Sequence, residues 1–120
     1  MARYGISTDL SGTVSPVILD IEYFNLGMMY QTGIFIIMDP GYYRLTVKCY
    51  HNPSTDFSKF AQLKVDIDSK PAVSTFCKYA DNGSASGIFY LEAFDTVFLE
   101  KSSERLSLGA YWNNFMIEKL

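Results

Sequence analysis

The stretch that decides the fold is Pro40-Gly41-Tyr42-Tyr43-Arg44-Leu45-Thr46-Val47-Lys48-Cys49. After the Pro-Gly turn, apolar and polar residues alternate. The odd-numbered positions are Tyr43, Leu45, Val47 and Cys49, and the even-numbered positions are Arg44, Thr46 and Lys48. Successive side chains of a β-strand point to opposite faces of the sheet. The stretch therefore predicts a strand whose Tyr43 face enters a core and whose other face meets solvent.

The same alternation recurs along the chain, between turn residues at short intervals. Leu63, Val65 and Ile67 alternate with Lys64, Asp66 and Asp68, which we expect on a solvated strand face. Further alternating runs are Phe89-Leu91, Val97-Leu99 and Phe115-Ile117. The turns are expected at 39–41, 51–56, 69–71, 81–84 and 101–105, where Pro, Gly, Asn, Asp and Ser gather. Some eight to ten short strands are typical of a β-sandwich or barrel.

Composition limits the class of protein. The chain has 120 residues, which predicts one domain, and 48% hydrophobic residues against 19% charged ones, which excludes a disordered tail. The net charge of −3 lacks the cationic footprint of a nucleic-acid binder, so no nucleic acid partner is expected. No apolar run reaches the roughly 20 residues of a membrane span, so no membrane insertion is expected. The first residues hold no signal-peptide h-region, which fits a cytosolic or a mature chain.

Two strands are apolar on both faces. These are Ile34 to Met38 and Gly87 to Leu91. A surface strand of a monomer should present one polar face, so a partner is expected to cover part of this surface. A second copy of the chain is the simplest cover, and we therefore predict a homo-oligomer.

Three ordered stretches resemble a known family. The first reads Asn25-Leu26-Gly27-Met28-Met29-Tyr30, Thr32-Gly33-Ile34-Phe35 and Pro40-Gly41-Tyr42-Tyr43-Arg44-Leu45; the second runs from Ser86 to Leu99; the third is Trp112-Asn113-Asn114-Phe115-Met116-Ile117. Their order and spacing resemble the globular domain of complement C1q and its C1q-like relatives. The matches spread over residues 14–120, nearly the whole chain.

The resemblance implies a fold and an assembly. It implies an all-β, C1q/TNF-like jelly-roll β-sandwich of about ten antiparallel strands. It would form a single C1q-like domain over 1–120 (core 14–120), assembled as a trimer. Phe94 departs from the family pattern, because it replaces the glycine of a Gly-Asp turn. Either that turn avoids a positive φ here, or the ring serves an interface. Asp95 matches the family's turn aspartate and is expected to cap its own turn.

Catalysis and zinc are not expected. The one histidine, His51, lies in a polar loop, and one His with two separated Cys makes no convincing zinc ligand set. The chain is therefore predicted not to be an enzyme. Calcium stays open as a cofactor, because some C1q-like domains bind it and Asp66, Asp68, Asp81 and Asp95 supply carboxylates. No metal ligand is assigned.

Ligand recognition is expected in loops, where aromatic rings stand beside carboxylates and amides. Such sets bind sugars, since the ring covers apolar C–H surface while the polar groups bind hydroxyls. The predicted ligand-binding residues are Tyr79, Asp81, Asn82, Tyr111 and Asn113. His51, Asn52 and Asp56 form a further candidate set, and Trp112 is expected in the core.

Cysteines and the single sequon leave alternatives open. Cys49 and Cys77 are either two buried free thiols or a pair that would have to cross between sheets. The disulfide of the complement chains is expected to be absent, because its second cysteine would align near Lys64. Asn82-Gly83-Ser84 is an N-glycosylation sequon.

The combined interpretation is a non-enzymatic C1q-like lectin. Without Gly-X-Y repeats, the chain is similar to stalkless, secreted C1q-domain lectins of invertebrate innate immunity, which bind glycans or glycoproteins as multivalent oligomers. A C1q-like protein-binding or receptor-ligand module is the alternative, and a structural trimerisation domain is a third.

Overall fold

The computed structural model describes residues 1–6, 13–50, 60–78, 82–102 and 114–120. Over these residues the chain is all β. The eleven strands are β1 (Ala2–Gly5), β2 (Thr13–Val14), β3 (Ile21–Asn25), β4 (Met29–Gln31), β5 (Ile34–Ile36), β6 (Gly41–Tyr50), β7 (Phe60–Ile67), β8 (Lys70–Lys78), β9 (Asn82–Leu91), β10 (Thr96–Ser102) and β11 (Asn114–Lys119). No helix in the described part of the chain is long and apolar enough to cross a bilayer.

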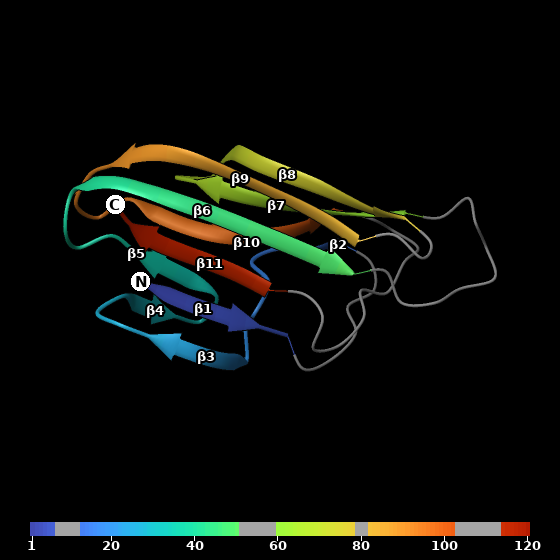
Figure 1. Cartoon of the computed structure of the whole chain (residues 1–120), viewed down its shortest axis with the longest axis horizontal. Coiled ribbons are helices and arrows are strands. Elements are labelled where there is room, and N and C mark those ends of the chain that lie inside the picture. Colours follow the sequence, from blue (N-terminus) through green and yellow to red (C-terminus); the bar gives the residue numbers. More distant parts are fainter. Residues whose placement is uncertain (7–12, 51–59, 79–81, 103–113) are drawn as a thin grey trace.

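Two antiparallel sheets form a sandwich. The first sheet has the order β3-β1-β11-β6-β9, and the second has the order β4-β5-β10-β7-β8, with β2 pairing the far half of β10. Figure 1 shows the two layers, with both chain ends near the same end of the sandwich. Strands adjacent in space are distant in sequence, as in β11 beside β6, which is the mark of a jelly roll.

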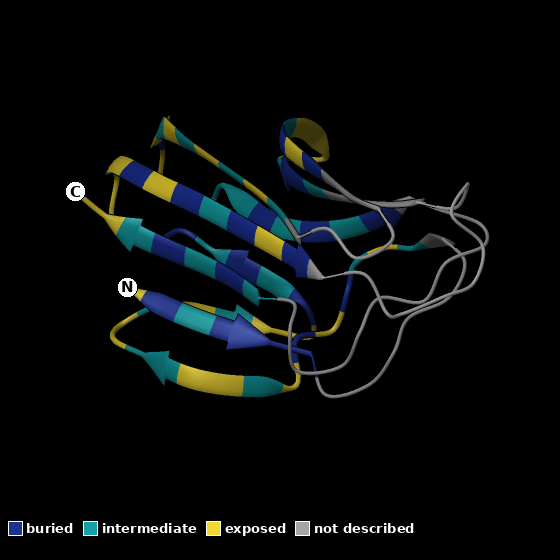
Figure 2. Cartoon of the chain, turned by 45° about the vertical axis from the view of Figure 1, so that its right-hand side comes forward, coloured by how far each residue is buried: buried dark blue, intermediate teal, exposed yellow. Residues whose placement is uncertain are grey.

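The inward row of β6 is buried as its alternation predicts. Tyr43, Leu45, Val47 and Cys49 are each at most 2% exposed, whereas Arg44 and Lys48 are exposed. Figure 2 shows buried and exposed residues alternating along the strand. Phe115 and Ile117 of β11 lie beside Val47 and Leu45 and are fully buried. The predicted core face of these strands is confirmed.

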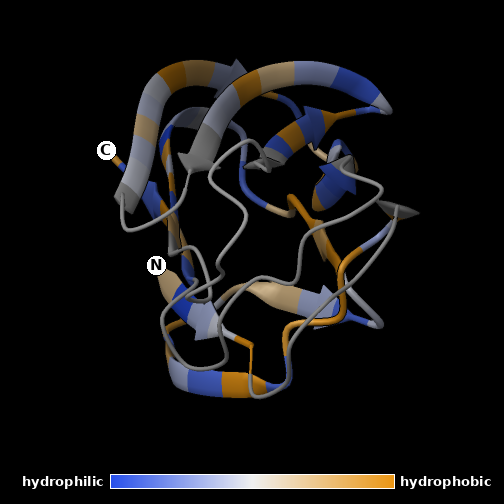
Figure 3. Cartoon of the chain, turned by 90° about the vertical axis from the view of Figure 1, so that its right-hand side faces the viewer, coloured by the Kyte–Doolittle hydropathy of each residue, from blue (hydrophilic) through white to orange (hydrophobic). Residues whose placement is uncertain are grey.

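The second sheet contributes the opposite side of the core. Phe35, Val65, Val97 and Leu99 are at most 1% exposed and belong to the same buried cluster. The ring of Phe35 lies 5.5 Å from that of Phe115 and bridges the two sheets. Viewed along the long axis, hydrophilic and hydrophobic residues alternate along the strands (Figure 3). Burial of one face of each sheet supplies the main stabilisation of such a fold.

Two hairpins close through residue pairs with positive φ. Thr32 (49°) and Gly33 (87°) join β4 to β5, and Asp68 (50°) and Ser69 (67°) join β7 to β8. Two successive positive φ values match the twist that antiparallel strands need. The turn predicted at 69–71 therefore lies earlier in the chain, at Asp68 and Ser69. Lys70 and Pro71 already belong to β8, and Asp68 follows the end of β7.

Cys49 is disulfide-bonded rather than a free thiol. The only other cysteine of the sequence is Cys77, which belongs to β8. Of the two alternatives stated for the cysteines, a free thiol at Cys49 is therefore excluded. A cross-link of this kind stabilises a fold chiefly by restricting the unfolded chain.

Two glycines with nearly equal φ allow a matched test of backbone strain. Gly33→Ala should destabilise the protein by about 2–3 kcal/mol, because its Cβ would lie 3.0 Å from the Val17 carbonyl oxygen at a φ of +87°. Gly27→Ala, at +82° with no atom within 4 Å of the new Cβ, should cost only about 1 kcal/mol. Urea unfolding of both variants would measure the difference, and equal losses would contradict the role of close packing at Gly33.

Candidate functional site

Four of the five predicted ligand-binding residues lie outside the described residues. These are Tyr79, Asp81, Tyr111 and Asn113, together with the secondary candidates His51, Asn52, Asp56 and Trp112. Asn82 is the first residue of β9, and its backbone lies opposite Tyr50 of β6. The ligand site assembled from these residues therefore stays a prediction.

The strands that flank these segments end at one end of the sandwich. Tyr50, where β6 ends, pairs with Asn82, where β9 begins, and Asn114, where β11 begins, pairs with Lys48. Lys78, where β8 ends, pairs with Phe60, where β7 begins. These strand ends lie together on the right of Figure 1. The segments 51–59, 79–81 and 103–113 are thus attached to the same end of the fold.

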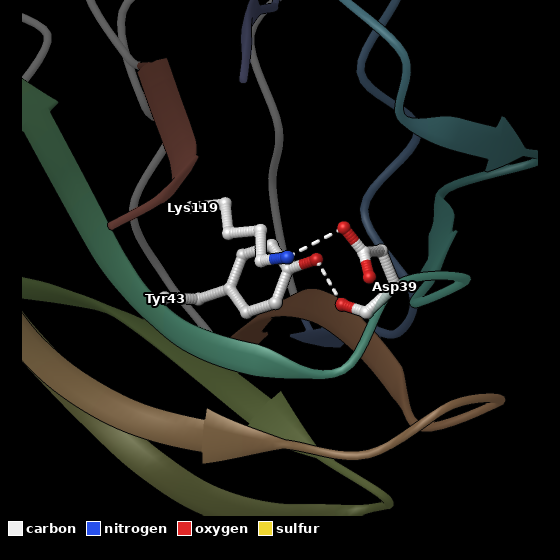
Figure 4. A network of polar contacts seen from close by, with 3 residues as sticks. All are labelled: Asp39, Tyr43 and Lys119. Carbon is white, nitrogen blue, oxygen red and sulfur yellow. Dashed lines mark hydrogen bonds and ion pairs between the residues drawn. The ribbon is translucent and has the colours of Figure 1, made fainter.

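The opposite end is held by a polar network. Lys119 at the end of β11 donates to a carboxylate oxygen of Asp39 at 2.5 Å, and the Tyr43 hydroxyl donates to the Asp39 carbonyl at 2.5 Å (Figure 4). The hydrogen bond to Asp39 raises the pKa of Lys119, and burial raises the pKa of Tyr43. The network ties the loop before β6 to the last strand, so its role is structural.

The polar network leaves little room for a side chain at Gly41. A Cβ there would lie 2.7 Å from Cε of Lys119, so the flexible end of the lysine side chain would have to move. The φ of Gly41 is +159°, close to the extended conformation. A side chain at this position is therefore limited by the space beside Lys119 and not by backbone strain.

The outward face of the first sheet carries an apolar patch on β6 and β9, which we call the Tyr42/Tyr90 patch. It consists of Tyr42, Ile88 and Tyr90, which are 59%, 54% and 55% exposed. Tyr42 lies directly opposite Tyr90, with ring centroids 5.2 Å apart in an edge-to-face arrangement. The prediction that residues 87–91 are apolar on both faces is confirmed here, and Tyr42 is an addition. The outward residues that follow Tyr42 on β6 are polar, so the alternation pattern predicted a polar outward face for this strand.

Charged and small residues flank this patch. Arg44, opposite Ile88, forms an ion pair with Glu118 at 3.0 Å. Ser84 and Ser86 continue the outward row of β9. Further along the sheet, the Arg3 guanidinium lies 4.8 Å from the ring centroid of Tyr23. Next to the patch the charges of Arg44 and Glu118 are paired, and the exposed Lys48 lies further along β6, opposite Ser84.

The turn between β9 and β10 resolves the question raised by Phe94. Its φ is +71°, so the turn keeps the positive φ of the glycine that it replaces, and its side chain is 73% exposed. Asp95 accepts a hydrogen bond from the Glu92 amide at 2.8 Å, which confirms that it caps its own turn. Of the two alternatives, avoidance of positive φ is excluded.

Asp66 is buried, contrary to the expected solvated strand face. It is 3% exposed, and one of its carboxylate oxygens has no hydrogen-bond partner. Burial and a hydrogen bond to Glu100 raise its pKa from 3.8 to about 6, although Lys64 opposes the shift. A buried carboxyl group beside a second one favours the protonated form.

Among the carboxylates considered for calcium, Asp81 lies outside the described residues, and the described ones do not form a cluster. Asp66 lies in β7, whereas Asp68 is in the following turn and accepts from the Thr96 amide at 2.9 Å. In the described ranges, no group of three His, Cys, Asp or Glu side chains could hold a metal ion.

Comparison with known proteins shows the fold. No protein-family model and no curated protein sequence matches the chain. Among solved structures, murine APRIL at pH 5.0 superposes with a TM-score of 0.72 at 15% identity, over 99% of this chain and 97% of that one. Murine APRIL at pH 8.0 gives a TM-score of 0.71 at 16% identity, over 99% and 97%. The chain is a TNF/C1q-like jelly-roll sandwich, as the sequence resemblance implied.

The raised pKa of Asp66 predicts a pH-dependent stability. A folded pKa of about 6 against 3.8 means that the folded state binds the proton more tightly than the unfolded chain. This contribution is complete below pH 4 and is lost as the pH rises through about 6. Asp66→Asn should therefore raise the stability at pH 7.5 by about 2 kcal/mol and leave it nearly unchanged at pH 4.

Urea unfolding across this pH range would measure the effect of Asp66→Asn. Glu92→Gln is the control, because it removes an exposed carboxylate from the turn at the end of the sandwich. A variant that is less stable than the wild type at pH 7.5 would show that Asp66 is held ionised.

Proposed function

We propose that this protein is a non-enzymatic recognition module that acts as a homo-oligomer, a trimer, and binds ligands outside the cell. The observation that carries the proposal is the Tyr42/Tyr90 patch. Three large apolar side chains gather on one sheet face with more than half of their surface exposed. Exposed apolar patches with a polar surround mark association sites.

A second copy of the chain suits this face better than an unlike partner. The ion pair of Arg44 and Glu118 balances the charge next to Ile88, and the exposed Lys48 lies further along the outward row of β6. Tyr42 and Tyr90 can pack on the same residues of other copies, as closed symmetric assemblies require. The number three follows from the resemblance to C1q-like domains.

The ligand we propose is a carbohydrate bound at the end of the sandwich opposite Asp39. Tyr79, Asp81, Asn82, Tyr111 and Asn113 would supply aromatic and hydrogen-bonding groups there, and several weak sites in one oligomer would add avidity. The lectin would serve innate immunity at microbial surfaces. The disulfide at Cys49 supports an extracellular location, because disulfides persist in oxidising compartments.

A protein-binding or receptor-ligand module is the second candidate. The exposed ring of Phe94 favours it, since aromatic anchors dominate protein interfaces. The murine APRIL structures share the jelly-roll fold of this chain, which is compatible with such a module. The structural trimerisation domain remains the third alternative; it would require the Tyr42/Tyr90 patch and no soluble ligand.

The association face can be tested with a charge. Tyr90→Glu should convert the oligomer to monomer, because a carboxylate would be buried between copies without a partner. Light scattering after gel filtration measures the mass. Met29→Glu, which alters an exposed residue on β4 of the other sheet, should leave the mass unchanged. A wild-type protein that is monomeric at micromolar concentration would overturn the proposal.

The carbohydrate site can be tested on a glycan array, with calcium and again with a chelator. We expect selective binding to acetylated or acidic sugars. Replacing both Asp81 and Asn82 with alanine should abolish this binding without lowering the melting temperature. Ser84→Ala, which also removes the sequon but keeps both side chains, is the matched control. If the folded oligomer binds no sugar on the array, the carbohydrate proposal is overturned and the protein-binding module takes its place.

A further inference from the structure

Phe94 combines two unfavourable features in one residue. Its backbone has a φ of +71°, a conformation that bulky side chains rarely adopt, and its ring is 73% exposed, the highest value among the exposed large hydrophobic residues of the described chain. Glycine would relieve the backbone strain and remove the exposed apolar surface at once. Strain of this kind at an exposed residue points to a function for the side chain.

The turn that carries Phe94 is fixed on both sides. The Phe94 amide donates to the Ile37 carbonyl at 2.6 Å, and the Ile37 amide donates to the Asp95 carbonyl at 2.9 Å. Asp95 closes the turn through the Glu92 amide at 2.8 Å. The ring is therefore presented by a rigid support, which lowers the entropy cost of binding.

A second apolar side chain lies on the adjoining segment. Met38 follows Ile37 directly and is 51% exposed. Phe94 and Met38 thus occupy neighbouring backbone segments at the end of the sandwich, which we call the Phe94 tip. The tip is separate from the predicted carbohydrate residues, which attach to the opposite end.

Acidic groups outnumber basic ones at the tip, where the exposed Lys70 follows the turn between β7 and β8. Asp68, Glu92 and Asp95 belong to the two turns that meet there, where the Asp68 amide donates to the Thr96 carbonyl at 2.9 Å. Asp39, on the third segment of this end, is neutralised by Lys119. These carboxylates would repel an anionic lipid surface and an identical acidic tip of another copy. They would attract a partner with basic groups.

From these observations we propose that the Phe94 tip docks into an apolar pocket of a different protein, rimmed by Lys or Arg. The ring would fill the pocket as the central anchor, Met38 would extend the contact, and Asp68 and Glu92 would pair with the basic rim. A projecting ring suits a pocket on the partner, whereas a sugar needs a hollow on the lectin. The proposal is independent of the carbohydrate site and of the Tyr42/Tyr90 patch.

A random peptide library displayed on phage tests the proposal directly. The wild-type oligomer is the bait, and Phe94→Gly is used for counter-selection. We expect enriched peptides that combine aromatic or aliphatic residues with Lys or Arg. Synthetic copies should bind the wild type at least about tenfold more tightly than Phe94→Gly or Phe94→Asn, and their affinity should fall with rising salt. Leu26→Ser, which removes an exposed apolar side chain at the far edge of the first sheet, should leave the affinity unchanged.

The same variants separate the competing explanations. Phe94→Gly should raise the melting temperature by a few degrees and keep the oligomer mass, because it removes strain and no internal contact. A lowered melting temperature would mean that the ring packs on its own domain, and a lowered mass would mean that a second copy covers it. Peptides that bind wild type and Phe94→Gly equally, or sugar binding lost in Phe94→Gly on the array, would also overturn the proposal.

Discussion

The packing of the inward row of β6 against the second sheet is the interaction on which the rest of the structure depends. β6 lies between β11 and β9, so its register sets which side chains of both neighbouring strands face inward. A slip by one residue would turn Tyr43 and Leu45 outward and bring Arg44 into the core. The hydrophobic energy lost by such a slip makes one register the only stable one.

The two ends of the sandwich differ in construction, and the difference organises the proposed functions. At one end, short hairpins and the contacts of Asp39 with Tyr43 and Lys119 bind the segments closely together. At the other, strands of both sheets lead into the connections 51–59, 79–81 and 103–113, which carry most of the predicted carbohydrate residues. A rigid end suits a fixed anchor such as Phe94, and an end where several connections begin suits a site that they share.

Exposed aromatic residues are the main departure of this fold from what stability alone requires. Tyr42, Tyr90 and Phe94 place apolar surface in water, and Phe94 adds backbone strain. Local choices that oppose stability mark functional sites, because selection retains them for another reason. The placement of these residues on one sheet face and on one end separates the proposed self-association face from the proposed partner-binding tip.

The sequence by itself determined the β class and the inward faces of the strands, because side-chain alternation and turn residues act over a few neighbouring positions. The apolar outward face of Ile88 and Tyr90 could be predicted for the same reason. The jelly roll was implied by the resemblance to C1q-like domains. Tertiary structure alone decided that Asp66 is buried beside Glu100 and that Cys49 is bonded. It also decided that the turn at Phe94 keeps a positive φ. These outcomes depend on which distant strands become neighbours, because burial, pKa values and cross-links are set by groups far away along the chain. The alternation of residues within one strand does not identify those groups.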